Sequence, residues 1–542
     1  MAYTGERKLL GWLGAETRVA PWDEAGVSRA LGCIGLPVYA VSLDGGLGLA
    51  TGAPKTAVVT ETLPMLACVP ACPIDQLGDP AFRRAHGLRY AYYGGSMANG
   101  IASVALAEAL GKAGFLGFFG AAGLPADVVE KAIDELEVRL GGLPYGCNLI
   151  HSPNEPDLEQ AVADLYIRRG VTLVEASAYL DLTLPIVKYR VHGIYRDDSG
   201  AIVTPNRVIA KCSRIEVASK FFAPPPARFL EPLVASGFIT PAQAELAARI
   251  PMAQDLTAEA DSGGHTDRRP AITLLPTMLA LAGQMQAKHT YAEPLRVGLG
   301  GGISTPASAA AAFAMGAAYL VTGSVNQACV ESGSSDTVRQ MLAETTQADI
   351  TMAPAADMFE MGVEVQVLKR GTMFAMRGTK LYELYRKYNR LEDIPADERE
   401  KLEKTMFRAP FSTVWEQTKA FFMRRDPKQI ARAEQDPKHK MALVFRAYLG
   451  QASGWANQGL PDRKIDYQIW CGPAMGAFNE WVRGSFLEAP ENRRAVTVAK
   501  NILYGAAVMT RCAALRNQGI PVPAEAVQVV PRPLDQLEEE WL

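Results

Sequence analysis

Two glycine-containing segments of the sequence have the composition of a phosphate-binding site. Gly300, Gly301 and Gly302 follow the apolar run "LRVGL" and precede the alanine-rich stretch "PASAAAAFAMGA", while Gly323 and Ser324 follow "YLVT". Backbone N–H groups exposed by glycines, the positive end of a helix and a hydroxyl bind an anion without a basic side chain. We therefore expect a phosphate cup here. An alternative is that the glycines only permit tight packing of strand and helix.

His265 has the surroundings best suited to proton transfer. It stands in "EADSGGHT", directly after Gly263 and Gly264. The ordinary imidazole pKa of about 6.5 suits proton exchange near neutrality, and two glycines would let a planar ligand lie against the backbone because no Cβ intervenes. We predict that His265 is catalytic. Surface or core roles are expected for the other five histidines, His86, His151, His192, His289 and His439.

Three further segments place polar groups where apolar runs end. Gly95 and Ser96 close "YYGGSMANG", Asn148 lies in "GCNLI", and Lys211 lies in "AKCS". An Asn side chain offers donors and an acceptor, as recognition of a flavin edge requires, and a lysine cation stabilises negative charge. Each residue alone is equally typical of a cap or a surface group. Their convergence at one end of a sheet would be the stronger signal.

The elements that must position these residues alternate regularly. Runs typical of strands are each followed by a segment of helical character, and eight of them fall within about 240 residues. This number and spacing predict an α/β fold, a closed (β/α)8 TIM barrel whose active site lies at the carboxyl ends of the strands. The expected strands are at 88–95, 115–120, 145–150, 171–178, 207–213, 252–260, 295–302 and 319–324.

The remaining sequence predicts additions to the barrel. We expect a small N-terminal α/β domain and connector at 1–80, with a strand in "LPVYAVSLDGGLGLA" that breaks at a glycine turn. The FMN-type barrel would span 81–350, a helical insertion or lid 351–490, and a closing barrel helix with a C-terminal tail 491–542. Within the barrel, residues 180–206 alternate around "DDSG" and predict a β-hairpin in place of one helix. The segment "DMFEMGVEVQVLKRG" is expected to be helical.

Composition and charge exclude several classes of protein. The 542 residues carry a net charge of −3, which gives no broad electrostatic footprint for nucleic acid. The apolar runs are interrupted by charges, Gly or Pro, so membrane insertion is not expected, and the N-terminus lacks a signal-type cleavage site, which favours a cytoplasmic protein. The eight dispersed cysteines match neither a disulfide framework nor a zinc spacing, and we expect buried thiols and no metal.

Several motifs together resemble the PfaD family. They are "GGSMANGIASVALAEALGKAGFLGFFGAAGLP", "YGCNLIHSPNEP", "EADSGGHTD", "GLGGGISTPASAAAAFAMGAAYLVTGSVNQACVESGSS" and "WCGPAMGAFNEWVRGSFLE". The resemblance spans about 60 to 520. PfaD proteins are trans-acting enoyl reductases of polyunsaturated fatty acid and polyketide synthases, related to nitronate monooxygenases and to FMN-dependent bacterial enoyl-acyl carrier protein reductases.

The resemblance implies an FMN at the barrel mouth. Gly95 and Ser96 would border the isoalloxazine ring, and Asn148 and Lys211 would contact its polar edge. Gly263 and Gly264 would lie beside the ring or the ribityl chain, and the phosphate would be held by Gly301, Gly302, Gly323 and Ser324. His265 matches the catalytic histidine of the superfamily. This chain departs from the superfamily pattern at Ser262, where alanine is frequent.

The implied activity is NADPH-dependent reduction of an α,β-unsaturated thioester on an acyl carrier protein. No GxGxxG fingerprint follows a strand, so the nicotinamide nucleotide is expected to visit the flavin without a Rossmann domain of its own. The alternatives are nitronate oxidation on the same barrel and a non-catalytic scaffold role within a synthase. The oligomeric state is left open, with a homodimer as one assembly.

Two surface features are open to more than one interpretation. The cations of "RRDPKQIARAEQDPKHK" could meet an acidic carrier protein, or could form a solvated helix face: Arg424, Arg425, Lys428, Arg432, Lys438 and Lys440. The aromatic residues Trp470, Phe478 and Trp481 could line an acyl pocket, although aromatic residues at helical spacing usually belong to a core.

Overall fold

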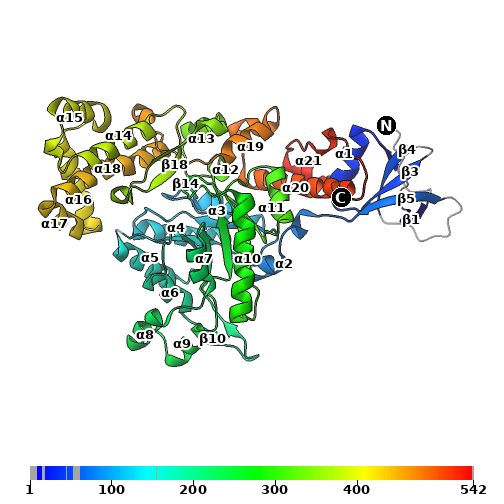
Figure 1. Ribbon diagram of the computed structural model, residues 1–542, viewed down its shortest axis with the longest axis horizontal. Coiled ribbons are helices and arrows are strands. Elements are labelled where there is room, and N and C mark those ends of the chain that lie inside the picture. Colours follow the sequence, from blue (N-terminus) through cyan, green and yellow to red (C-terminus); the bar gives the residue numbers. More distant parts are fainter. Residues whose placement is uncertain (1–8, 15–18, 44–45, 53–61, 154, 540–542) are drawn as a thin grey trace.

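A closed barrel of eight parallel strands forms the centre of the computed structural model, which describes residues 9–14, 19–43, 46–52, 62–153 and 155–539 (Figure 1). The predicted TIM barrel is therefore confirmed, and a strand lies in each of the eight expected segments. In chain order they are β6 (Tyr92–Gly94), β7 (Leu116–Phe119), β8 (Gly146–Ile150), β9 (Leu173–Ser177), β12 (Arg207–Cys212), β13 (Asp255–Glu259), β15 (Arg296–Gly300) and β16 (Leu320–Thr322).

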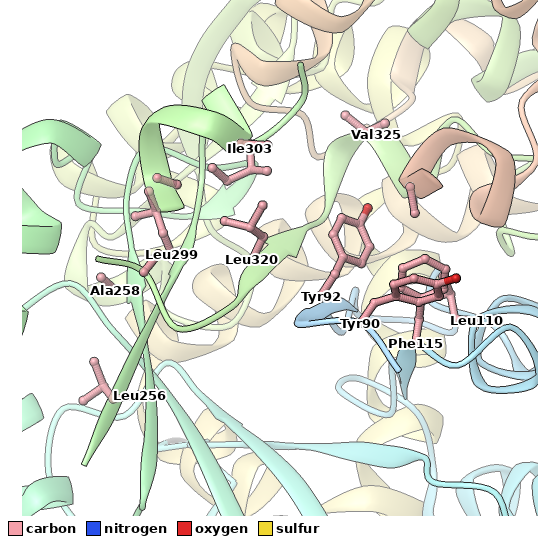
Figure 2. Packing of buried hydrophobic residues seen from close by; sticks show 14 of the residues in the cluster. Tyr90, Tyr92, Leu110, Phe115, Leu256, Ala258, Leu299, Ile303, Leu320 and Val325 are labelled. Atoms are coloured by element: carbon pink, nitrogen blue, oxygen red, sulfur yellow. The ribbon is translucent and has the colours of Figure 1, made fainter. Parts of the chain in front are cut away.

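Alternation along the barrel strands separates an outer apolar layer from an inner polar one. Leu256 and Ala258 of β13 belong to the large apolar cluster, which Figure 2 shows together with Leu299 and Leu320 of the neighbouring strands. Between them, Thr257 is completely buried and bonds to two tyrosine hydroxyls inside the barrel. Because side chains alternate between the two faces of a strand, Glu259 is on the inner side, at the carboxyl end of β13.

Seven helices that follow barrel strands cover the outside of the barrel. They are α3 (Val104–Lys112), α4 (Ala126–Leu140), α5 (Pro156–Arg169), α6 (Leu184–Val191), α7 (Ile215–Phe222), α10 (Ala271–His289) and α11 (Pro306–Ala314), with α8 (Ala227–Ala235) and α9 (Pro241–Ala247) added after α7.

The eighth helical position is filled from far along the chain. β16 is followed only by the short α12 (Ser324–Gln327), and α20 (Ala495–Asn517) packs against both α11 and α3. The approach to α11 is close: a Cβ on Gly505 would lie 2.5 Å from Cγ of Pro306. The segment between α12 and α20 is thus an insertion into the last unit of the barrel.

The insertion contains a small sheet and a helical unit. The sheet has the order β14 (Gly264–His265), β18 (Glu364–Leu368), β17 (Ile350–Pro354), so its first strand comes from the loop after β13. The helical unit has its own apolar core. Its helices are α14 (Phe374–Lys387), α15 (Ala396–Leu402), α16 (Phe411–Arg425), α17 (Pro427–Gln435) and α18 (Pro437–Gln458), and α19 (Ala474–Val482) then packs on α12.

An antiparallel sheet with the order β1-β5-β3-β4-β2 lies at the opposite end of the molecule from the helical unit (Figure 1). α20 holds this part, because Arg511 donates to the carbonyl oxygens of Leu31, Cys33 and Leu36. The glycine turn predicted here lies partly outside the described residues. The elements are β1 (Gly11–Gly14), β2 (Val19–Pro21), α1 (Glu24–Gly32), β3 (Val38–Leu43), β4 (Gly46–Thr51) and β5 (Thr62–Val69).

Two secondary-structure predictions are wrong. Residues 180–206 contain α6 before the short hairpin of β10 (Tyr195–Arg196) and β11 (Ile202–Val203), so the hairpin adds to the helix instead of replacing it. Pro185 lies in the first turn of α6 and favours a helix start, and burial of Ile186 and Val187 outweighs their preference for strands. In "DMFEMGVEVQVLKRG", β18 forms because its backbone pairs with β14 and β17.

The cysteines behave as predicted. All eight lie within the described ranges and none forms a disulfide; Cys147, Cys212, Cys329, Cys471 and Cys512 are buried. In the same part of the chain, no cluster of three or more His, Cys, Asp or Glu side chains could hold a metal ion. None of the helices described has the length and apolar character needed to cross a membrane.

Substitution of Gly505 tests how the barrel is closed. We expect Gly505→Val to lower the free energy of unfolding by about 1–3 kcal/mol, because the new side chain would be forced against Pro306. Gly283→Ala is the control, since a Cβ there meets no heavy atom within 4 Å and alanine favours a helix. Urea denaturation measures both, and equal stability of the two variants would contradict the tight contact between α20 and α11.

Candidate functional site

A cavity of about 690 Å³ lies at the carboxyl ends of the barrel strands, beneath the inserted helical unit. Its walls come from the loops after the strands and, on the opposite side, from α16, α18 and the segment 468–474. Every site residue predicted from the sequence lines this cavity: Gly95, Ser96, Asn148, Lys211, Gly263, Gly264, His265, Gly301, Gly302, Gly323 and Ser324.

The two glycine segments of the predicted phosphate cup lie side by side. β15 and β16 pair in parallel with Gly300 opposite Val321, so both glycine loops emerge at the same edge. A Cβ on Gly302 or Gly323 would meet no heavy atom within 4 Å, whereas one on Gly301 would lie 2.6 Å from the carbonyl carbon of Ala260. Gly301 therefore serves packing, as the alternative interpretation required, and Gly302 and Gly323 leave open space that suits a phosphate.

The glycines before His265 are needed for a different reason from the one expected. A Cβ on Gly263 would lie 2.8 Å from the backbone nitrogen of Cys471, and one on Gly472 would lie 2.8 Å from the backbone nitrogen of Gly263. Gly263 is thus required because two backbone segments cross there. Gly264 has φ +79° and faces Trp470 at ordinary contact distance, so its conformation favours glycine.

His265 pairs with a carboxylate from the insertion. It lies on β14 opposite Val365 of β18, and its Nε2 is 3.1 Å from Oδ1 of Asp357. Burial by itself lowers the pKa of His265, but Asp357 and Glu259 outweigh burial and the nearby Lys211, so the pKa is raised. Burial acts in the opposite direction on Asp357, yet His265 holds the pKa of that carboxyl below its ordinary value. The pair therefore favours the imidazolium form.

Glu175 was not predicted from the sequence, although it organises this end of the barrel. It is completely buried on β9 and accepts hydrogen bonds from the Tyr93 hydroxyl at 2.9 Å and the backbone N–H of Ser96 at 2.9 Å. The Ser96 hydroxyl also donates to it. A charged residue within the otherwise apolar strand "VTLVEASA" was the available signal, because a carboxylate is rarely buried without partners.

Lys211 is held between carboxylates. Its Nζ lies 3.1 Å from Oε1 of Glu259. Burial by itself lowers the pKa of Lys211, but Glu175 and Glu259 raise it further, so the net pKa is above the ordinary value. The ammonium group is therefore a permanent cation that is partly neutralised by the protein.

The amide group of Asn148 is oriented by the neighbouring strand. Its Nδ2 donates to the carbonyl oxygen of Glu175 at 3.1 Å and to the hydroxyl of Ser177 at 3.0 Å. The side-chain donors are thereby used, and the carbonyl oxygen is the atom that Asn148 can offer to a ligand. Asn148 consequently suits a ligand that presents an N–H group.

The two uncertain surface features are clarified by their contacts. Trp470 lines the cavity, whereas Phe478 is completely buried in the core and Trp481 packs against it. Of the cations at 424–440, Arg425 pairs with Glu155 at 2.5 Å and Lys428 pairs with Asp157 at 2.7 Å. These two cations join the helical unit to the barrel loop before α5.

Comparison with known families agrees with this geometry. Residues 92–383, more than half of the chain, match the nitronate monooxygenase family. The chain belongs to the nitronate monooxygenase family. Within this member of the family, residues 388–467 also match the inserted helical domain of [acyl-carrier-protein] S-malonyltransferase, and this range covers most of α15 to α18.

The relatives place this nitronate monooxygenase family member in the PfaD-type branch, as the sequence motifs indicated. One component of the polyunsaturated fatty acid synthase of Thraustochytrium sp. is 49% identical over 456 residues, which are 83% of this chain and 30% of that component. The polyketide biosynthesis protein PksE of Bacillus subtilis is 43% identical over 436 residues, 80% of this chain and 56% of PksE. The chain thus spans less than two thirds of each of these relatives.

A solved structure gives the same result. The enoyl reductase domain of MlnA, from the macrolactin biosynthesis cluster of Bacillus amyloliquefaciens, superposes with a TM-score of 0.77 at 38% identity, covering 82% of this chain and 99% of that domain. The insertion and the barrel are therefore shared with a structure of the same branch.

Replacing Asp357 tests the electrostatics of the site. We expect Asp357→Asn to lower the pKa of His265, because the amide removes the charge that stabilises the imidazolium. The imidazole resonances of His265, followed by NMR as a function of pH, give this pKa directly. Asp393→Asn, which removes a carboxylate paired with Arg390 in the helical unit, is the control. An unchanged pKa in Asp357→Asn would contradict the proposed coupling.

Proposed function

We propose that this protein reduces the α,β double bond of enoyl thioesters carried on an acyl carrier protein, with FMN as cofactor and NADPH as reductant. The observation that carries the proposal is that an open backbone cup and the His265–Asp357 pair face one cavity. Kinship with the enoyl reductase domain of MlnA supports the reaction class. Kinship with synthase components supports a carrier-bound substrate.

The residues around the cavity fit FMN. Gly302, Gly323 and Ser324 would hold the phosphate, with Gly301 fixing the turn. The Ser324 hydroxyl accepts the N–H of Gly472 at 3.0 Å, and its own hydrogen remains free to donate to the phosphate. When bound, FMN supplies the hydride chemistry, accepting two electrons from NADPH and passing a hydride to the β-carbon of the enoyl group.

The polar wall of the cavity would hold the ring system of FMN. Gly95 and Ser96 would border the ring, and Gly264 would approach it without a Cβ. Asn148 would accept a hydrogen bond from a ring N–H, and Lys211 would stabilise negative charge. Gly263 would support this wall through its contact with Cys471.

His265 would deliver the proton that completes the reduction. The doubly protonated ring donates from Nε2 to Asp357, which leaves the N–H at Nδ1 for the α-carbon of the substrate. After the transfer, the neutral ring keeps its Nε2 proton and its bond to Asp357. The raised pKa of His265 keeps this acid charged near neutrality, which favours proton donation over a role as a base in nitronate or nitroalkane chemistry.

The reaction is tested with three additions to one sample. We expect the purified protein to be yellow, NADPH to bleach it, and a crotonyl thioester to restore the absorbance at a rate far above that of dissolved oxygen. His265→Gln should still bleach with NADPH, but its re-oxidation by the thioester should slow by about 10²-fold or more, because general acid catalysis contributes about this factor. Re-oxidation by an alkyl nitronate with oxygen, and not by the thioester, would instead identify a nitronate oxidase.

A second variant tests the phosphate cup alone. Gly323 has φ −122°, which a β-branched residue adopts without strain, and a Cβ there would enter open space. We expect Gly323→Val to fold normally and to lower the affinity for FMN at least about tenfold, since the side chain occupies the room needed by the phosphate. FMN content after gel filtration measures the effect, with Gly283→Ala as the control. Full FMN retention in Gly323→Val would contradict the cup.

A further inference from the structure

The cavity extends well beyond the phosphate cup. In the ring of eight strands, β15 and β8 are four places apart, so the cup after β15 and the loop after β8 lie on opposite sides of the barrel mouth. The far side is lined by Pro125 after β7 and by Leu158 at the start of α5. A ligand anchored by its phosphate at the cup therefore leaves a second region of the cavity free across the mouth.

This second region is roofed by one face of α16. Thr418, Phe421 and Phe422 line the cavity. Phe421 is 47% exposed although it borders an enclosed space, while Phe422 beneath it is only 6% exposed. The two rings meet edge to face, 5.1 Å apart. An aromatic side chain that remains so accessible inside a cavity offers an apolar contact surface to a ligand.

The facing helix, α18, is cut back where it borders the same region. Ala447, Gly450 and Gln451 occupy positions i, i+3 and i+4, which lie on one face of a helix. Gly450 lies in the interior of a helix of 22 residues, where glycine costs roughly 1 kcal/mol relative to alanine. A Cβ at this position would meet no heavy atom within 4 Å. Packing does not explain the glycine, but clearance for a ligand does.

The cations beside this region are already paired. Arg425 makes a bidentate pair with Glu155, at 2.5 and 3.0 Å, and Arg446 lies 3.2 Å from Glu360. Among the described residues that line this half of the cavity, no arginine or lysine is left without a carboxylate partner. A dinucleotide would bring two phosphates and would need such cations. An uncharged hydrocarbon chain needs none.

We propose that the groove between Phe421 of α16 and Gly450 of α18 binds the acyl chain of the thioester, and that Gly450 sets how long a chain is accepted. This inference rests on the proposed function for its substrate class. The polar half of the cavity would hold the cofactor, and the apolar half would hold the chain, with the reacting double bond between them near His265. Interdomain pairs such as Arg425 with Glu155 fix the width of the groove.

The test compares chain lengths in one variant and a matched control. Gly450→Leu places a side chain in the groove. Gly454→Leu places the same side chain one turn further along α18, at a position that does not line the cavity and where a Cβ has no heavy atom closer than 3.8 Å. Calorimetry measures binding of a saturated dodecanoyl thioester of N-acetylcysteamine. Steady-state assays then give kcat/KM for the crotonyl and the dodecenoyl thioesters.

The expected result is selective. Gly450→Leu should weaken dodecanoyl binding, and lower kcat/KM for the dodecenoyl thioester, by roughly 50-fold, the factor for excluding about three methylene groups. The crotonyl value and the FMN content should not change, and Gly454→Leu should behave like the parent protein. Unchanged dodecanoyl binding in Gly450→Leu, or an equal loss in both variants, would overturn the acyl groove. If the parent binds the dodecanoyl thioester in a manner that depends on Gly450 but reduces neither enoyl substrate, the groove stands and the proposed reaction fails.

Discussion

The crossing of three backbone segments, 261–265, 364–368 and 469–472, holds the functional end of the molecule together. β18 pairs with β14 on one side, and Cys471 donates from its backbone N–H to the carbonyl oxygen of Gln366 on the other, at 3.3 Å. The buried side chain of Gln366 then donates to Asp261 and to the carbonyl oxygen of Ser262. Gly263 and Gly472 are required because no Cβ fits between the segments. Through this crossing, the insertion becomes part of the barrel's own loop after β13.

The remaining geometry of the site depends on that crossing. It brings Asp357 to His265, although the two residues are 92 positions apart in the sequence. It also brings Gly472 to the hydroxyl of Ser324, so that the segment after the helical unit touches the phosphate cup. A proton donor and a cofactor site that belong to different parts of the chain are thereby fixed to one another, which is the preorganisation that catalysis requires.

The helical unit is more than a cover. It contributes Phe421 and Gly450 to the cavity, and it is joined to the barrel by Arg425 with Glu155 and by Asn99, whose amide donates to the hydroxyl of Ser453 at 3.1 Å. The polar strands of the barrel and the apolar faces of α16 and α18 divide the cavity into two chemically different halves. Such a division suits a substrate that must present one polar, reactive end to a bound cofactor.

The pattern of residues along the chain was enough to predict the barrel, because the alternation of apolar strands with helices is a local pattern that only a parallel, closed sheet buries completely. It was also enough to predict the glycines, the lysine, the asparagine and the histidine at the strand ends, since carboxyl ends of parallel strands meet at one edge. The folded chain was needed to show that Gly263 makes room for Cys471, that Glu175 and Asp357 belong to the site, and that 184–191 is a helix. These features depend on contacts between residues far apart in the chain, where burial and backbone pairing outweigh the local preferences from which secondary structure is predicted.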